Sequence, residues 1–234
     1  IVNHGNQKEI DYWSLTTAFD ISTATHDGAF SISGQEARAN SVAFNNDGTR
    51  MIVAGAGNMS QHRIHEYSLS TGFDLSSTVT HLNTEDLSST HDYIDGVTFN
   101  YDGTKMYTIN GAEDLMSQFK LTTPYDVSTL SLEGTYNVSS LTNNAREVVF
   151  SNDGSKMFIL DDLDNKIHEF NLSCNWSIID GACDDPITNS DEGKDILSSI
   201  ESQTATAKQI AIQASTPVLN RMYWLRRHRT SDQL

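Results

Sequence analysis

The residues best suited to chemistry in this chain are acidic, and three of them stand in Asp-Gly pairs that recur at regular intervals. An Asp carboxylate beside Asn and Thr oxygens resembles a Ca²⁺ ligand, but calcium takes six to eight oxygens and each pair supplies one carboxylate. Asp-Gly is also the pair that a tight hairpin turn favours, because glycine adopts positive φ without strain. We therefore expect structural turns at Asp47-Gly48, Asp102-Gly103 and Asp153-Gly154.

A denser acidic group, Asp161, Asp162 and Asp164, is a weak candidate for a calcium site, and no firm metal site or cofactor is expected. His65 and His168 each precede a Glu, but they occupy the same position of two repeats. Equivalent positions lie on different structural units, so a structural role is expected for both. No Ser–His–Asp or nucleophile-elbow pattern is present, and no catalytic residue is predicted.

The two cysteines, Cys174 and Cys183, are separated by eight residues that include a glycine. This spacing suits a disulfide that fastens the end of the repeats, which implies export from the cytoplasm. The alternative is a pair of free thiols in a reducing compartment. Two ligands alone make a poor zinc site.

Two blocks of sequence recur and must position these residues. The first reads Val-x-Phe, then Asp-Gly, then Thr/Ser-Lys/Arg-Met, and it occurs at 42–51, 97–106 and 148–157. The second reads Ile/Met-x-x-aromatic-x-Leu and occurs at 10–15, 64–69, 116–121 and 167–172. Four residues after each of its leucines comes an aromatic residue, namely Phe19, Phe73, Tyr125 and Trp176.

These blocks predict short antiparallel strands. Val and Phe alternate in the first block and so face one side of a strand, Asp-Gly turns the chain, and the next residues return as a second strand. The second block predicts a third strand, and a weaker fourth is expected near 30–32, 79–82 and 130–136. Four antiparallel strands in a repeat of about 50 residues are typical of a β-propeller blade. We predict an all-β fold of propeller blades over residues 1–185.

The ring that these blades form is expected to be partial. Residues 1–3 align with 108–110, the end of a second strand, so the chain is expected to begin inside a blade. Three repeats and a part cannot close a ring, because propellers use about four to eight blades. Blades upstream in a longer chain, or other copies of this chain, are the expected partners.

Residues 186–234 lack strand alternation and predict an α-helical linker or tail. Apolar residues recur there at helical spacing, and the last segment carries the basic residues Arg221, Arg226, Arg227 and Arg229. A solvated basic face is one interpretation. Contact with an acidic wall or a membrane interface is the other. The formal net charge of the whole chain is −16, which argues against nucleic acid as a partner.

The first block, with the stretch Glu-Tyr-x-Leu-Ser-Thr-x-Phe-Asp-Leu-Ser at 66–76, resembles the YVTN/lactonase-like propeller repeats of bacterial surface proteins and some phage tail proteins. The segment 217–229 resembles the linker between passenger and barrel in some bacterial autotransporters. The resemblance to the YVTN/lactonase-like repeats covers roughly residues 1–180 and implies a propeller. It is less informative about function, because such blades serve binding, adhesion and catalysis.

Taken together, these features favour a non-enzymatic propeller at the cell surface or outside the cell. It would serve adhesion, assembly or display of a protein or glycan ligand, as a fragment of a larger exported protein such as an autotransporter passenger, whose tail contacts a membrane barrel. One alternative is a phage tail or fibre component that oligomerises through the tail. A second is a lactonase-like enzyme, which should gather acidic or His residues at the inner strand ends of different blades.

Overall fold

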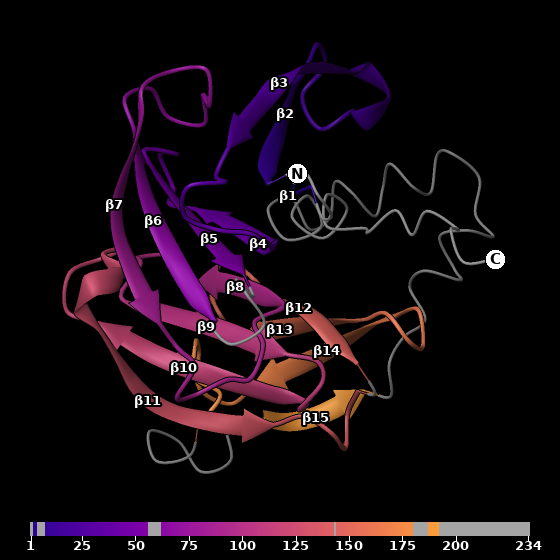
Figure 1. Cartoon of the computed structure of the whole chain (residues 1–234). Coiled ribbons are helices and arrows are strands. Elements are labelled where there is room, and N and C mark those ends of the chain that lie inside the picture. Colours follow the sequence, from indigo (N-terminus) through magenta and orange to yellow (C-terminus); the bar gives the residue numbers. More distant parts are fainter. Residues whose placement is uncertain (1, 4–7, 56–61, 143, 180–186, 192–234) are drawn as a thin grey trace, which may run out of the picture.

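The computed structural model describes residues 2–3, 8–55, 62–142, 144–179 and 187–191 (Figure 1). These residues form four antiparallel sheets and two 3₁₀ turns, η1 (Ile21–Thr23) and η2 (Val127–Thr129), with no α-helix among them. The all-β prediction is therefore confirmed. The expected α-helical tail, with its four arginines, lies outside the described residues, and no helix within them is long and apolar enough to cross a membrane.

Each sheet follows the order of the sequence. The first sheet contains β1 (Val2–Asn3), β2 (Glu9–Leu15) and β3 (Ala24–Ser31). The second contains β4 (Ala39–Phe44), β5 (Arg50–Gly55), β6 (Arg63–Leu69) and β7 (Val79–Asp86). The third contains β8 (Gly96–Phe99), β9 (Lys105–Asn110), β10 (Leu115–Leu121) and β11 (Leu130–Asn137). The fourth contains β12 (Ala145–Phe150), β13 (Lys156–Asp161), β14 (Lys166–Leu172) and β15 (Ile187–Asp191).

The weaker strands expected from the sequence are present as β3, β7 and β11. Their alternating exposure agrees with a half-buried outer strand, as in the pattern of β7. β15 lies beyond residue 185, where the sequence analysis places the start of the tail, and pairs with β14 as the outer strand of the fourth sheet.

In the second, third and fourth sheets, the aromatic residue after the second block covers the glycine of the turn in its own sheet. Phe73, Tyr125 and Trp176 all have φ of 60–61°, and their backbone N–H groups donate to the carbonyls of Gly48, Gly103 and Gly154 at 2.9–3.0 Å. A Cβ on any of these glycines would overlap the aromatic ring. The glycines also have φ of 70–73°, a region that favours glycine. We name this arrangement the aromatic–glycine lock.

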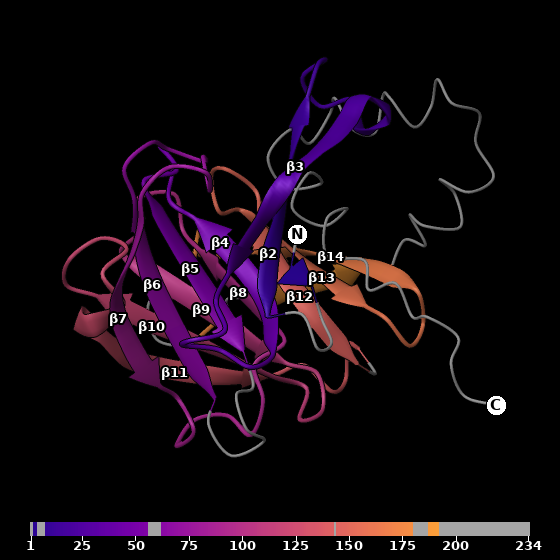
Figure 2. The same ribbon diagram turned by 45° about the horizontal axis from the view of Figure 1, so that its top comes forward.

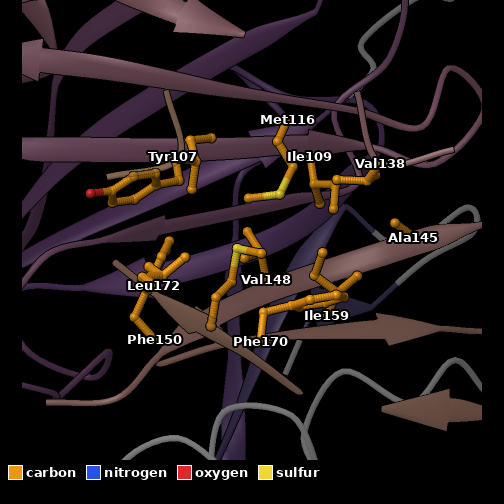
Figure 3. Packing of buried hydrophobic residues seen from close by; sticks show 12 residues of the cluster. Tyr107, Ile109, Met116, Val138, Ala145, Val148, Phe150, Ile159, Phe170 and Leu172 are labelled. Carbon is orange, nitrogen blue, oxygen red and sulfur yellow. The ribbon is translucent and has the colours of Figure 1, made fainter. Parts of the chain in front are cut away.

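The apolar core lies between neighbouring sheets. Figure 3 shows the cluster that joins the third and fourth sheets, in which Ile109 and Met116 pack against Val148, Phe170 and their neighbours. A second cluster joins the second and third sheets, and another joins the first and second. Side chains of two sheets thus share each core, which fixes the sheets as consecutive layers.

The innermost strands lie beside one another, since β4 packs next to β8 and β8 next to β12. The later strands of each sheet lie progressively further out, as in the blades of a propeller (Figure 1). In Figure 2 the β2–β3 hairpin projects from the body formed by the other three sheets. The inner strands are therefore the place where residues from different sheets meet.

Candidate functional site

The carboxylates of the Asp-Gly pairs are engaged within their own turns. Oδ1 of Asp47 accepts the N–H of Thr49 at 2.9 Å and its hydroxyl at 2.5 Å, and Asp102 and Asp153 make the equivalent bonds. These hydrogen bonds lower the pKa of the Asp47 and Asp102 carboxyls. At Asp153 a hydrogen bond from the Ser151 hydroxyl has the largest effect, and together with the turn contacts it lowers the pKa to about 2. The contacts account for the repetition of these residues without a metal.

Asp161, Asp162 and Asp164 do not converge on one point. Asp161 is buried and its Oδ1 accepts the N–H groups of Leu163 and Asp164. Asp162 instead lies 2.9 Å from the Arg146 guanidinium. No group of three or more His, Cys, Asp or Glu side chains that could hold a metal ion occurs in the described ranges.

The two histidines of the second block lie in different sheets, and one of the two cysteines is outside the described residues. His65 Nε2 is 3.5 Å from Glu36 in the second sheet, and His168 Nε2 is 3.7 Å from Asp161 in the fourth. Each histidine thus pairs with an acid of its own neighbourhood. Cys183 is outside the described residues, so its disulfide with Cys174 stays a prediction.

A buried polar group occupies the inner strands, where the sequence analysis predicted no site. Ser41 of β4, Gly96 of β8 and Glu147 of β12 each precede the Val of the first block, so they hold the same position in three sheets. The Ser41 hydroxyl donates to Oε2 of Glu147 at 3.0 Å, across 106 residues of sequence. Both side chains are buried. We name Ser41, Gly96 and Glu147, together with Asp95 and Arg146 beside them, the axial cluster.

The geometry of the axial cluster depends on the missing side chain of Gly96. A Cβ there would lie 2.6 Å from Oε1 of Glu147, so glycine makes room for the carboxylate. The N–H of Val97 donates to Oγ of Ser41 at 3.2 Å. Because Oγ accepts this bond, the Ser41 hydroxyl proton is directed at Glu147.

Arg146, which precedes Glu147 in β12, is held by two other carboxylates. Arg146 lies 2.7 Å from Oδ1 of buried Asp95 and 2.9 Å from Oδ2 of Asp162. Burial opposes the charge of Arg146, but the attraction of Asp95 and the hydrogen bonds to both acids raise its pKa. The other carboxylate oxygen of Asp95 accepts the N–H of Gly111 at 2.9 Å. The Arg146 side chain is about a quarter exposed.

The axial cluster has the composition of an acid–base site: a buried carboxylate that can accept a proton, a hydroxyl that holds it, and a fixed cation. The sequence signal for it was a departure from the repeat. The position before the Val of the first block is Ser in one sheet, Gly in the next and Glu in the last, so it does not have the same structural role in each. Positions that match between the repeats do not reveal it.

The opposite ends of the same strands enclose a hollow of about 130 Å³. Its lining comes from the second, third and fourth sheets and carries no charged side chain, with Phe44, Phe99 and Phe150 among its residues. An uncharged lining lacks groups for acid–base chemistry. The axial cluster, although it is not at this hollow, is therefore the better candidate for a reaction site.

The fold is similar to that of several solved structures. A protein from Lactobacillus plantarum matches with a TM-score of 0.51 and 11% identity, over 81% of this chain and 52% of that one. A Bacteroides fragilis protein assigned provisionally as a 6-phosphogluconolactonase matches with a TM-score of 0.48 and 15% identity, over 77% of this chain and 50% of that one. The periplasmic gluconolactonase of Pseudomonas aeruginosa matches with a TM-score of 0.47 and 14% identity, over 66% and 40%.

This chain therefore spans about half the length of the structures it matches. No family model and no curated protein matches it. The likeness is consistent with a β-propeller, and at these identities it shows the fold alone. Nothing in the comparisons supports the expected resemblance to an autotransporter linker or a phage tail component.

The expectation of a non-enzymatic adhesion propeller is wrong. The finding that stands against it is that two of the matching structures are named as lactonases. The physical reason for the error is that the sequence analysis required acidic residues gathered at inner strand ends and found none in the repeat pattern. Folding places Glu147 of the fourth sheet against Gly96 of the third, the residue that follows Asp95.

Proposed function

We propose that this protein is a lactonase-like hydrolase that opens a cyclic ester at the axial cluster. The observation that carries the proposal is the hydrogen bond between Glu147 of the fourth sheet and Ser41 of the second, beside the Arg146–Asp95 ion pair. A buried carboxylate held in this way is a candidate general base.

The proposed reaction needs no group beyond water and the residues of the axial cluster. Glu147 accepts a proton from a water molecule as its oxygen attacks the carbonyl carbon of the lactone. The tetrahedral intermediate then collapses, the ring C–O bond breaks, and the protonated Glu147 returns its proton to the departing alkoxide oxygen. One lactone and one water give one hydroxy acid.

Arg146 and Ser41 have separate tasks in this scheme. The Arg146 guanidinium, oriented by two carboxylates, stabilises the negative charge that develops on the carbonyl oxygen. The Ser41 hydroxyl on Oε2 and the Val148 N–H on Oε1 hold the Glu147 carboxylate in one orientation, in which one of its remaining lone pairs accepts the proton of the water. Asp95 is a positioning residue because it acts through Arg146.

An exported location fits this proposal. The acidic chain and the predicted Cys174–Cys183 disulfide both suit an oxidising compartment outside the cytoplasm. Protein or glycan ligands, and a metal at Asp161, Asp162 and Asp164, are not needed for the proposed reaction.

The test is turnover of δ-gluconolactone and γ-butyrolactone by the purified chain, measured by acid release in a pH-stat after the spontaneous rate is subtracted. Glu147→Gln should lower kcat by about 100-fold or more, since it removes the base. Glu9→Gln is the matched control, because Glu9 is only partly buried and lies in the first sheet. Turnover no faster than the spontaneous rate, or an unchanged kcat in Glu147→Gln, would refute the proposal.

A further inference from the structure

The hollow at the other end of the inner strands from the axial cluster is lined largely by aromatic rings. Phe99 and Phe150 are its most buried rings, each 6% exposed, and Phe44 holds the same position in the second sheet. Tyr125 and Trp176, the aromatic residues of the aromatic–glycine lock in the third and fourth sheets, also line it. Aromatic side chains thus reach this one hollow from three sheets.

The folded chain itself holds these rings in place. The centroid of the Tyr125 ring lies 5.3 Å from that of Phe99. The rings of Trp176 and Phe150 are separated by the same distance. The Trp176 carbonyl accepts the hydroxyl of buried Tyr107 at 2.6 Å, which fixes the backbone behind the indole. A lining that is ordered in advance lowers the entropy cost of binding a ligand.

The side-chain amides at the hollow are largely engaged. Asn46 donates an amide N–H to the Tyr101 carbonyl at 2.6 Å. Asn100 uses both ends of its amide, because its Nδ2 donates to the Thr104 hydroxyl at 3.1 Å and its Oδ1 accepts a backbone N–H at 2.9 Å. The Asn46 oxygen and the amide of exposed Asn152 are left to meet a ligand. A sugar ring presents more hydroxyl groups than these can satisfy, so a ligand without donors at its buried end fits better.

The surroundings of the hollow are acidic. Asp47, Asp102 and Asp153 are exposed, and each directly follows a lining residue. The hydrogen bonds within their turns lower the pKa of all three carboxyls, which are therefore charged at neutral pH. Lys105 reaches a backbone carbonyl of the lining at 3.2 Å, but Glu133 lies 3.8 Å from its ammonium group and compensates its charge. This field attracts a cation and repels an anion.

We propose that the hollow binds a quaternary ammonium cation of the choline type. Such a group carries no N–H, so an uncharged lining leaves none of its hydrogen bonds unmade. It is attracted to aromatic faces within about 6 Å of the ring centroid. The hollow, of about 130 Å³, takes the trimethylammonium group, and Tyr101, which is 64% exposed, supplies a further ring. This site is separate from the axial cluster, and the proposal is independent of the proposed hydrolase activity.

Isothermal titration calorimetry of the full chain tests the proposal with two probes of the same shape. One is choline, and the other is its neutral analogue, in which a tert-butyl group replaces the trimethylammonium group. We expect choline to bind about fivefold or more tightly, the effect of a single cation–π contact. Equal affinities would mean that the hollow recognises apolar shape alone. That result, absence of choline binding, or tighter binding of methyl glucoside than of choline would overturn the proposal.

Variants of Tyr101 test whether the hollow is the site. Tyr101→Ala should weaken choline binding about fivefold, whereas Tyr101→Phe should retain it because the ring remains. Since Tyr101 is exposed, both variants should fold, which circular dichroism checks. Phe19→Ala is the matched control, because Phe19 is an aromatic residue that is 53% exposed and does not line the hollow. An affinity for choline that Tyr101→Ala leaves unchanged, or that Phe19→Ala lowers equally, would refute the assignment.

Discussion

The aromatic–glycine lock allows a stability prediction whose magnitude follows from the structure. In Gly103→Ala, two costs combine. The backbone φ of 73° places a Cβ in the left-handed region, which costs about 1–2 kcal/mol. The same Cβ overlaps the ring of Tyr125, and overpacking of this kind costs about 1–3 kcal/mol. The free energy of unfolding should therefore fall by about 2–5 kcal/mol.

Urea denaturation followed by tryptophan fluorescence measures this loss, and a double-mutant cycle separates its two parts. In a Tyr125→Ala background the ring is gone, so Gly103→Ala should cost only the about 1–2 kcal/mol of backbone strain. Gly34→Ala is the control, because no atom lies within 4 Å of its Cβ and its φ is outside the left-handed region. If the costs of Gly103→Ala and Tyr125→Ala were additive, the overlap would not exist and the reasoning would fail.

Two further predictions concern buried charge. Arg146→Ala should lower the free energy of unfolding by about 3 kcal/mol, because it leaves Asp95 buried without its cation. Thermal or urea denaturation measures this loss, and an unchanged midpoint would contradict the prediction. Burial, with a smaller effect of His62, lowers the pKa of His91 to about 4. Between pH 6.5 and 4 the unfolded chain therefore binds a proton at this residue and the folded chain does not, so the free energy of unfolding should fall as the pH drops through this range. His91→Gln should flatten that part of the stability profile, measured by urea midpoints between pH 4 and 7.5, and an equal slope in both proteins would count against the assignment.

Much of the fold could be predicted from the sequence because local chemistry and repetition agree. Asp-Gly at Asp47, Asp102 and Asp153 specifies a turn by itself, and the alternation around it specifies the strands. The positions of Phe73, Tyr125 and Trp176 were visible as a repeat, but their purpose was not. Only the structure shows that each ring covers a glycine 22 to 25 residues before it.

The axial cluster could not be predicted in the same way. Ser41 and Glu147 are separated by 106 residues, and their contact depends on how the second, third and fourth sheets are arranged in space. Repeat analysis finds what blades share, whereas a reaction site needs the blades to differ. Gly96 illustrates this, because its role is to leave space for a residue of another sheet. The wrong functional prediction came from weighing the shared positions alone.

The aromatic–glycine lock differs from the hydrogen bonds between sheets in where its two halves come from. Both halves of the lock, such as Gly103 and Tyr125, belong to one repeat, so a gene duplication copies it whole. The hydrogen bonds from Val127 to Glu66 and from Ile178 to Gln118 each join two repeats, and a duplicated repeat therefore carries a donor for the blade before it and an acceptor for the blade after it. Recombination between repeats can thus lengthen or shorten such a chain without leaving a turn uncovered. Change in blade number is then limited by closure of the ring and not by the integrity of any blade.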